Sequence, residues 1–183
     1  EGEGGQRWFH LYPDEQVTFD DELHWTGRSQ NWNFMCADCH TTDFRKNYSI
    51  DTATYASHFA EVTVGCEACH GPGSAHIASG GSEAFESDRR NSGVFTPRGQ
   101  VEVCAKCHSR RGAIAEGFEP GDAFLDHYRP SLLEQGLYYA DGQIQDEVYV
   151  YGSFLKSKMH QPGVTCTDCH EPPSAQLTFD RND

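Results

Sequence analysis

Long apolar runs are missing from this sequence. A helix that crosses a membrane needs about 20 consecutive apolar residues, and no stretch of the 183 residues approaches that length. Heptad repeats and glycine-rich phosphate-binding loops are missing too. We therefore expect no membrane span, no coiled coil and no nucleotide site of the P-loop type.

Positive charge is scarce as well. Lysine and arginine number 14 against 28 aspartates and glutamates, which gives a formal net charge of -14 at pH 7. Proteins that bind nucleic acids need a basic face to contact the phosphates, so we do not expect nucleic acid as a partner. An acidic surface is most simply a well-solvated one, although it would also suit docking to a basic partner protein.

Cysteine is absent outside four short segments. Each segment has the form C-x-x-C-H, and together they contain all eight cysteines of the chain. In chain order, motifs 1 to 4 are Cys36-Ala37-Asp38-Cys39-His40, Cys66-Glu67-Ala68-Cys69-His70, Cys104-Ala105-Lys106-Cys107-His108 and Cys166-Thr167-Asp168-Cys169-His170. No cysteine is left over for a separate disulfide or redox pair.

The spacing within each motif is that of a covalent haem site. On one helical turn, cysteines at i and i+3 share a face and can bond both vinyl groups of a porphyrin, and the histidine at i+4 lies under the iron. A zinc site, a redox dithiol or a disulfide framework would not need a histidine after every second cysteine. We therefore predict four haems c, attached through Cys36, Cys39, Cys66, Cys69, Cys104, Cys107, Cys166 and Cys169, with proximal ligands His40, His70, His108 and His170.

Four haems would decide how a chain of this composition folds. Only 37% of its residues are hydrophobic, which is little for a core of side chains, and the chain is too short to surround each haem separately. We expect stacked haems as the core, within a mainly irregular chain that has short α-helices. Asp141-Gly142, between runs of aromatic and β-branched residues, predicts one β-hairpin. Short helices are expected over residues 55–61 and just before His160.

The chain reads as one unit. We interpret residues 1–183 as a single tetrahaem cytochrome c domain, in which the glycine-rich residues 1–5 form a flexible lead-in. Haem c is attached outside the cytoplasm, so we expect the precursor to carry an export signal and the sequence to be a mature or trimmed form. The expected location is periplasmic or extracellular. A small basic spot, Arg110-Arg111, is expected to pair with haem propionates or carboxylates.

Histidine is more abundant than the proximal positions require. Ten histidines are present, and six remain after the proximal ones: His10, His24, His58, His76, His127 and His160. Four of these would fill every distal position, and Met35 and Met159 are the only methionine alternatives. Two histidines per iron favour low-spin haems of low potential that transfer electrons, whereas an open iron would point to catalysis.

Several segments resemble a known family. Residues 8–13, 24–28, 31–35 and 71–76, with further matches over 146–154 and 157–164, are similar to the haem domain of multihaem cytochromes related to the cytochrome c554 group. Many members of that group carry a tetratricopeptide-repeat region. The resemblance implies His10, His24, His76 and His160 as the distal ligands. The sequence departs from the family at Pro172-Pro173, where Pro-His is usual, and lacks the repeat region and the upstream haem motifs.

These observations favour electron transfer through four closely packed haems, with redox proteins as partners and no enzymatic activity. Two forms of this function stay open: the subunit of an extracellular cytochrome filament, which would bind identical subunits head to tail, and a monomeric periplasmic carrier. Short tetrahaem chains resemble the subunits of such filaments, in which a histidine of one subunit can ligate a haem of the next. A multihaem enzyme acting on small nitrogen or sulfur compounds ranks last.

Overall fold

The computed structural model describes residues 9–10, 12–84, 96–172, 174 and 176–179. The predicted lead-in, residues 1–5, and Trp8 of the family-like segment lie outside the described residues. Within the described part the chain is mainly irregular, with short helices and three two-stranded antiparallel sheets. The prediction of an irregular chain with short helices is confirmed.

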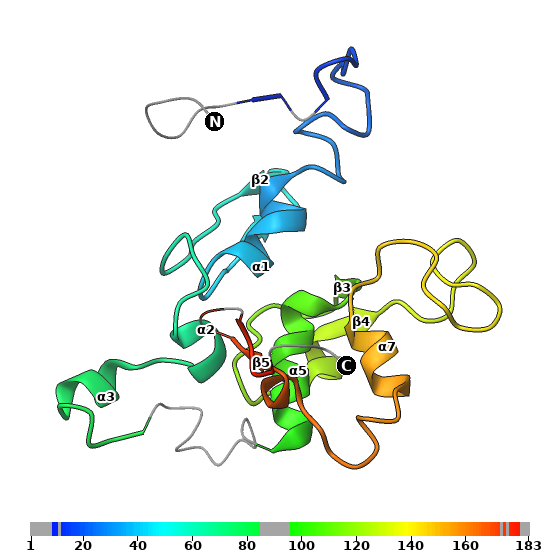
Figure 1. The fold of residues 1–183 in the computed structure, drawn as a ribbon. Coiled ribbons are helices and arrows are strands. Elements are labelled where there is room, and N and C mark those ends of the chain that lie inside the picture. Colours follow the sequence, from blue (N-terminus) through cyan, green and yellow to red (C-terminus); the bar gives the residue numbers. More distant parts are fainter. Residues whose placement is uncertain (1–8, 11, 85–95, 173, 175, 180–183) are drawn as a thin grey trace, which may run out of the picture.

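The longest helix, α5 (Pro97–His108), runs through the middle of the molecule and carries motif 3 (Figure 1). Its start follows helix-capping rules: the Thr96 hydroxyl accepts a hydrogen bond from the backbone N–H of Gly99 (3.1 Å), and Pro97 occupies the first turn. Val101, Val103 and Ala105 are buried along α5. This helix is the element around which the other motifs are arranged.

The other helices are one or two turns long. They are η1 (Trp32–Cys36, a π-helix) leading into α1 (Ala37–His40), α2 (Glu67–His70), α3 (Ser74–Ala78), α6 (Phe124–His127), α7 (Tyr151–Lys156) and η2 (Cys166–Asp168, a 3-10 helix). The helix expected just before His160 is α7, which ends four residues earlier than that histidine.

The strands differ from the single hairpin that the sequence predicts. The antiparallel pairs are β1 (Tyr48–Ser49) with β2 (Thr54–Tyr55), β3 (Arg111–Ala113) with β4 (Tyr128–Pro130), and β5 (His170–Glu171) with β6 (Gln176–Leu177). At Asp141-Gly142 the turn exists, because Tyr139 and Gln143 bond across it (2.9 Å), but only the bridge between Tyr138 and Ile144 follows. The predicted hairpin there is wrong as a strand pair.

The helix predicted over residues 55–61 is also wrong. His58 and Arg45 exchange backbone hydrogen bonds (2.8 and 2.9 Å), and Thr42 bonds Glu61 in the same antiparallel sense. The segment is therefore extended and returns along the chain that enters β1. Pairing with residues 42–49 satisfies its backbone groups, and this long-range partner outweighs a weak local helical preference.

The protein's own hydrophobic core is small. Phe118, Phe124 and Tyr128 pack on Ala105 of α5, and Tyr151 of α7 covers them; Phe124 has no exposed surface. Among the described residues nine hydrophobic side chains are buried, whereas 24 large hydrophobic side chains are exposed. That ratio leaves much apolar surface for something other than the chain to cover.

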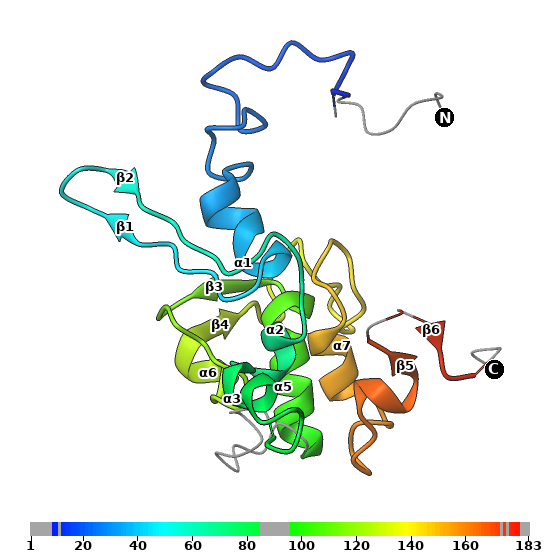
Figure 2. The ribbon, with the colours of Figure 1, turned by 90° about the vertical axis from the view of Figure 1, so that its left-hand side faces the viewer.

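Two segments, which we call the outer segments, project from the central body of α1, α5, α6, α7, β3 and β4. They are residues 9–30 and residues 71–84, which include α3 (Figures 1 and 2). The hydrogen bonds of residues 9–30 join only near neighbours in the sequence. In the part of the chain that the structure describes, no helix has the length and apolar character needed to cross a membrane.

Candidate haem-binding site

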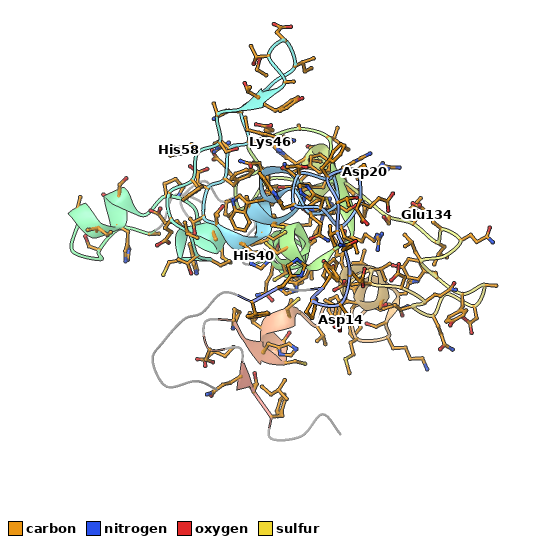
Figure 3. All side chains as sticks on the ribbon, turned by 90° about the horizontal axis from the view of Figure 1, so that it is seen from above. Asp14, Asp20, His40, Lys46, His58 and Glu134 are labelled. Carbon is orange, nitrogen blue, oxygen red and sulfur yellow. The ribbon has the colours of Figure 1, made fainter. Side chains whose placement is uncertain are left out.

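Three of the four motifs form a turn of α-helix that ends on the predicted proximal histidine. α1 ends at His40, α2 at His70 and α5 at His108. This is the geometry that brings cysteines at i and i+3 onto one face, with the histidine beside them. In Figure 3, His40 lies near the middle of the projected molecule.

Motif 4 is built differently. Only Cys166–Asp168 is helical, as a 3-10 turn, and His170 begins strand β5. The Asp168 carboxylate accepts hydrogen bonds from the Thr165 N–H (2.7 Å) and hydroxyl (2.9 Å), which caps the turn. The backbone N–H of Thr178 donates to the carbonyl of Cys169 (2.9 Å) and draws the chain into the β5–β6 pair instead of a longer helix.

Motifs 1 and 3 face each other through their second cysteines. The Cys39 Sγ lies 3.8 Å from the Lys106 carbonyl oxygen, and the Cys107 Sγ lies 3.9 Å from the Cys39 carbonyl oxygen. A hydrogen bond between the two thiols lowers the pKa of Cys39 to about 7 and raises the pKa of Cys107. These sulfurs would not titrate as thioethers, but their contact places two haem attachment points side by side.

Motif 4 packs on the other end of motif 3. A hydrogen bond with Cys166 raises the pKa of the Cys104 thiol. Beside this contact, the Gln100 Oε1 of α5 accepts from the backbone N–H of Thr167 (3.2 Å) and from its hydroxyl (3.1 Å). The first cysteine of motif 3 thus meets motif 4, while its second cysteine meets motif 1.

Motif 2 lies within electrostatic reach of the same helix. Burial raises the pKa of the Cys69 thiol, and the positive charge of Lys106 on α5 opposes that rise. Gly71 ends α2 with φ of 71°, a left-handed conformation that favours glycine. All four motifs therefore gather around α5, with motif 3 at the centre.

A cavity of about 860 Å³ opens between motifs 1 and 3, with Cys39 and Cys107 on its wall. This volume is within the roughly 300–1,000 Å³ of protein sites for cofactors and drug-sized ligands. Six of the chain's 14 cationic side chains line it: Arg28, Lys46, Lys106, Arg110, Arg111 and Arg129. In so acidic a chain, this concentration of positive charge suits a ligand that carries carboxylates, as haem does in its propionates.

The apolar part of the cavity wall also fits a porphyrin. Phe34, Met35 and Tyr149 line it and are 40 to 51% exposed. The Trp32 ring lies 6.4 Å from the His40 ring, centroid to centroid. Flat aromatic and apolar surface beside a proximal histidine is what a porphyrin face would cover. Thiols, cations and apolar surface together fit haem c at this place.

The four histidines that the family resemblance implies as distal ligands lie far apart in structural terms. His10 and His24 are on the outer segment 9–30, where the His10 Nδ1 accepts from the Tyr12 N–H (3.0 Å) and the His24 Nδ1 contacts the Thr26 hydroxyl (2.8 Å). His160 follows α7, with its ring 5.5 Å from Phe154 edge to face. The structure does not bring these side chains together with the motif histidines.

His76 has the environment of a poised ligand. It lies on α3, five residues beyond the end of motif 2 at Gly71, and its Nδ1 is 2.6 Å from the Glu83 carbonyl oxygen. A carbonyl can only accept, so the Nδ1 carries the proton and the Nε2 presents a lone pair. Metal-bound histidines are usually held by such a bond from the other ring nitrogen.

The remaining candidates sit in settings of another kind. His58 lies on the extended return strand (Figure 3), where its backbone pairs with Arg45. The His127 ring packs on the core residue Phe118 at 5.5 Å, and its Nε2 lies 3.4 Å from a carboxylate oxygen of Asp122. Met35 lines the cavity between motifs 1 and 3, and Met159 is 59% exposed.

One group of side chains at the site was not predicted from the sequence. The Asp38 carboxylate in motif 1 accepts from Arg111 (2.6 Å) and from the Tyr128 hydroxyl (3.1 Å). The expectation that the Arg110-Arg111 spot pairs with carboxylates is confirmed by this contact. A sequence signal existed, because motifs 1 and 3 differ at the same position by opposite charges, Asp38 and Lys106. In the described residues, no three His, Cys, Asp or Glu side chains cluster as a metal site.

This arrangement is that of a c-type cytochrome, and the comparison with protein families agrees. Residues 8–71 match the family described as cytochrome c554 and c-prime. The chain belongs to the cytochrome c554-related group through that segment, which supports a c-type cytochrome that carries electrons with haem c as cofactor. Comparisons with curated proteins and with solved structures found no match.

Proposed function

We propose that the chain transfers electrons through four covalently bound haems c within a single domain, residues 1–183. The observation that carries this proposal is the packing of all four C-x-x-C-H motifs around α5. Cysteines of neighbouring motifs touch, so haems attached to them would lie close together. Short separations between redox centres are what allow electrons to pass along a chain of them.

The roles follow from position. The eight motif cysteines hold the porphyrins as thioethers, and His40, His70, His108 and His170 ligate the irons on the proximal side. His10, His24, His76 and His160 are the proposed distal ligands. Haem iron, when bound, supplies one-electron chemistry between its ferric and ferrous states. The chain contributes ligation, burial and charge, and we assign no catalytic residue. Redox proteins are the proposed partners, in the periplasm or outside the cell.

Mass spectrometry of the denatured chain tests the cofactor count. Thioethers survive denaturation, so the proposal requires four haem masses added to the polypeptide. Cys166→Ala with Cys169→Ala should lower the count by one and leave three. Fewer than four haems on the wild type, or zinc bound instead, would refute the tetrahaem function.

Spectroscopy of the oxidised protein tests the ligation. Two histidines on every iron make all four haems low-spin. His76→Ala should convert one haem to a high-spin form, whereas the control His58→Ala should change none. A high-spin signal in the wild type would contradict full ligation and favour an enzyme that binds a small nitrogen or sulfur compound at an open iron.

A filament is a second form of the same function, and one observation favours it. The outer segment 9–30 projects away from the body and carries His10 and His24 (Figure 1). A histidine on a projecting segment can reach a haem of another subunit, and head-to-tail contacts of that kind extend into polymers. Since the chain is acidic and copies repel one another, a specific His–iron bond would be needed to hold them.

His10→Ala separates the filament from the monomeric carrier. If His10 bridges subunits, the wild type forms filaments visible by electron microscopy, and the variant stays monomeric with one five-coordinate haem. His58→Ala is the control and should leave assembly unchanged. A wild type that remains monomeric at high concentration, with every iron ligated internally, would support the carrier.

A further inference from the structure

One carboxylate joins two of the motifs. Asp38 lies between the two cysteines of motif 1, and its Oδ2 accepts from the Arg111 Nη2 at 2.6 Å. Its Oδ1 lies 3.7 Å from the Nζ of Lys106, which lies between the two cysteines of motif 3. The Tyr128 hydroxyl donates to the Oδ2 at 3.1 Å. We call these four residues the Asp38 cluster.

The cluster is shielded from water. The side chains of Arg111 and Lys106 are 9% and 10% exposed, and that of Asp38 is 26% exposed. Burial lowers the pKa of Arg111, but the Asp38 carboxylate raises it above its ordinary value. Burial also raises the pKa of Tyr128, which therefore stays a neutral donor. Breaking a buried ion pair leaves one charge uncompensated, so such pairs resist separation.

Further bonds tie the cluster to motif 3. The Arg111 Nε donates to the carbonyl oxygen of Lys106 at 2.5 Å, and the Arg111 guanidinium lies 3.8 Å above the Tyr128 ring. Arg111 and Tyr128 belong to β3 and β4, which pair with each other. The strand pair, motif 1 and motif 3 are thus held at one point.

The equivalent positions of the other motifs form no such link. Motif 2 has Ala68, which carries no charge. Motif 4 has Asp168, but this carboxylate accepts from Thr165 of its own turn. Within the described residues, Asp38 and Lys106 are the pair through which two C-x-x-C-H motifs bond by the residues between their cysteines.

We propose that Asp38 is a positioning residue that locks the haems of motifs 1 and 3 into one coupled pair and biases their reduction potentials. The inference rests on the proposed function, because it requires haem at both motifs. Thioethers attach each porphyrin to the helical turn that carries Asp38 or Lys106. A shift of either turn therefore moves a porphyrin edge, and the ion pair fixes the spacing between the two.

The charges predict opposite effects on reduction. A carboxylate beside a haem favours the ferric state, which has the extra positive charge, and a guanidinium favours the ferrous state. Asp38→Asn removes the carboxylate and leaves Arg111 uncompensated, so reduction becomes easier. Arg111→Gln leaves the carboxylate uncompensated, so reduction becomes harder. A residue with a purely structural role would not produce effects of opposite sign.

The experiment is a reductive titration of the holoprotein, with dithionite as electron donor, together with circular dichroism in the Soret band. Asp38→Asn should raise the potential of one or two haems, with roughly a threefold to tenfold change in the one-electron equilibrium. Arg111→Gln should lower it. Both should weaken the Soret couplet that reports the relative orientation of neighbouring haems. The double variant should show clear non-additivity, since both residues belong to one contact.

Asp168→Asn is the matched control, because it removes the same charge from the same position of motif 4. It should leave the potentials and the couplet of the motif 1–motif 3 pair unchanged. If Asp38→Asn does not accumulate, Tyr128→Phe removes one hydrogen bond to the carboxylate and should shift the same signals more weakly. Unchanged signals in every cluster variant, or equal effects from Asp168→Asn, would overturn the inference. Failure of the proposed function would instead appear as missing haem mass in the wild type.

Discussion

The central body and the outer segments are organised in different ways. In the body, Asp38 bonds Arg111 and Tyr128, which follow it by 73 and 90 positions in the sequence. In the outer segment 9–30, hydrogen bonds reach only near neighbours. The body is therefore held by contacts of the chain with itself, while the outer segments carry three of the four proposed distal histidines. The comparison suggests that haem ligation completes the fold where the chain's own contacts are few.

Loss of the central haem should have the largest effect. Cys104→Ala removes an attachment point in the motif that touches motifs 1 and 4, so we expect loss of one haem and a marked drop in thermal stability. Cys166→Ala is the control at the edge of the cluster and should cost less. Haem content by mass and melting followed by circular dichroism measure both. Equal losses would show that motif 3 is not central.

Truncation of the core should come next. Phe124 has no exposed surface and packs on Tyr128 and Tyr151, so Phe124→Ala should lower the free energy of unfolding by about 3–5 kcal/mol. Phe19→Ala, in an outer segment and 84% exposed, should stay within about 0.5 kcal/mol of the wild type. Denaturant titration gives both values. A large loss at Phe19 would mean that the haem-bound outer segment buries that ring.

A smaller loss is expected at the start of α5. Thr96→Ala removes the hydroxyl that accepts from the Gly99 N–H and should cost about 1 kcal/mol of unfolding free energy. Thr96→Ser keeps a capping hydroxyl and should restore most of the loss. The same denaturant titration is suitable. No difference between the alanine and serine variants would argue against a capping role.

The smallest effect is expected on the surface of the same helix. Arg98 pairs with Glu102 at 2.7 Å, one turn further along, but the Arg98 side chain is 78% exposed. Water screens such a pair, so Arg98→Ala should unfold at the same denaturant concentration as the wild type. Glu102 also accepts from the Phe124 N–H, so Glu102→Gln should be the more harmful change of the two. The reverse order would contradict this account.

Local patterns in the sequence predicted local features well. The i, i+3, i+4 spacing of motifs 1 to 3 predicted helical turns that end at His40, His70 and His108, and these are present. Asp141-Gly142 predicted a turn, and the turn exists. Each of these features depends on a few adjacent residues, so a short window of sequence contains what is needed.

The failures all involve partners distant in the chain. Residues 55–61 have a weak helical pattern but form an extended return strand, because residues 42–49 offer their backbone groups. The residues around Asp141-Gly142 have strong β character but no adequate facing strand. His170 leaves the helical turn of motif 4 because the following chain bonds back to Cys169. Such competition between local preference and long-range pairing is invisible to a local pattern.

The sequence by itself determined the chemistry of the chain: eight cysteines and four histidines in fixed spacing indicate covalent haem, since thioether attachment needs only adjacent residues. The tertiary structure alone decided which motifs are neighbours. It placed Cys39 against Cys107 and Cys104 beside Cys166, and it brought Asp38 to Lys106 and Arg111. Those contacts depend on the packing of α1, η2 and β3 around α5. Packing joins residues by burial and charge rather than by spacing, so no motif in the sequence contains it.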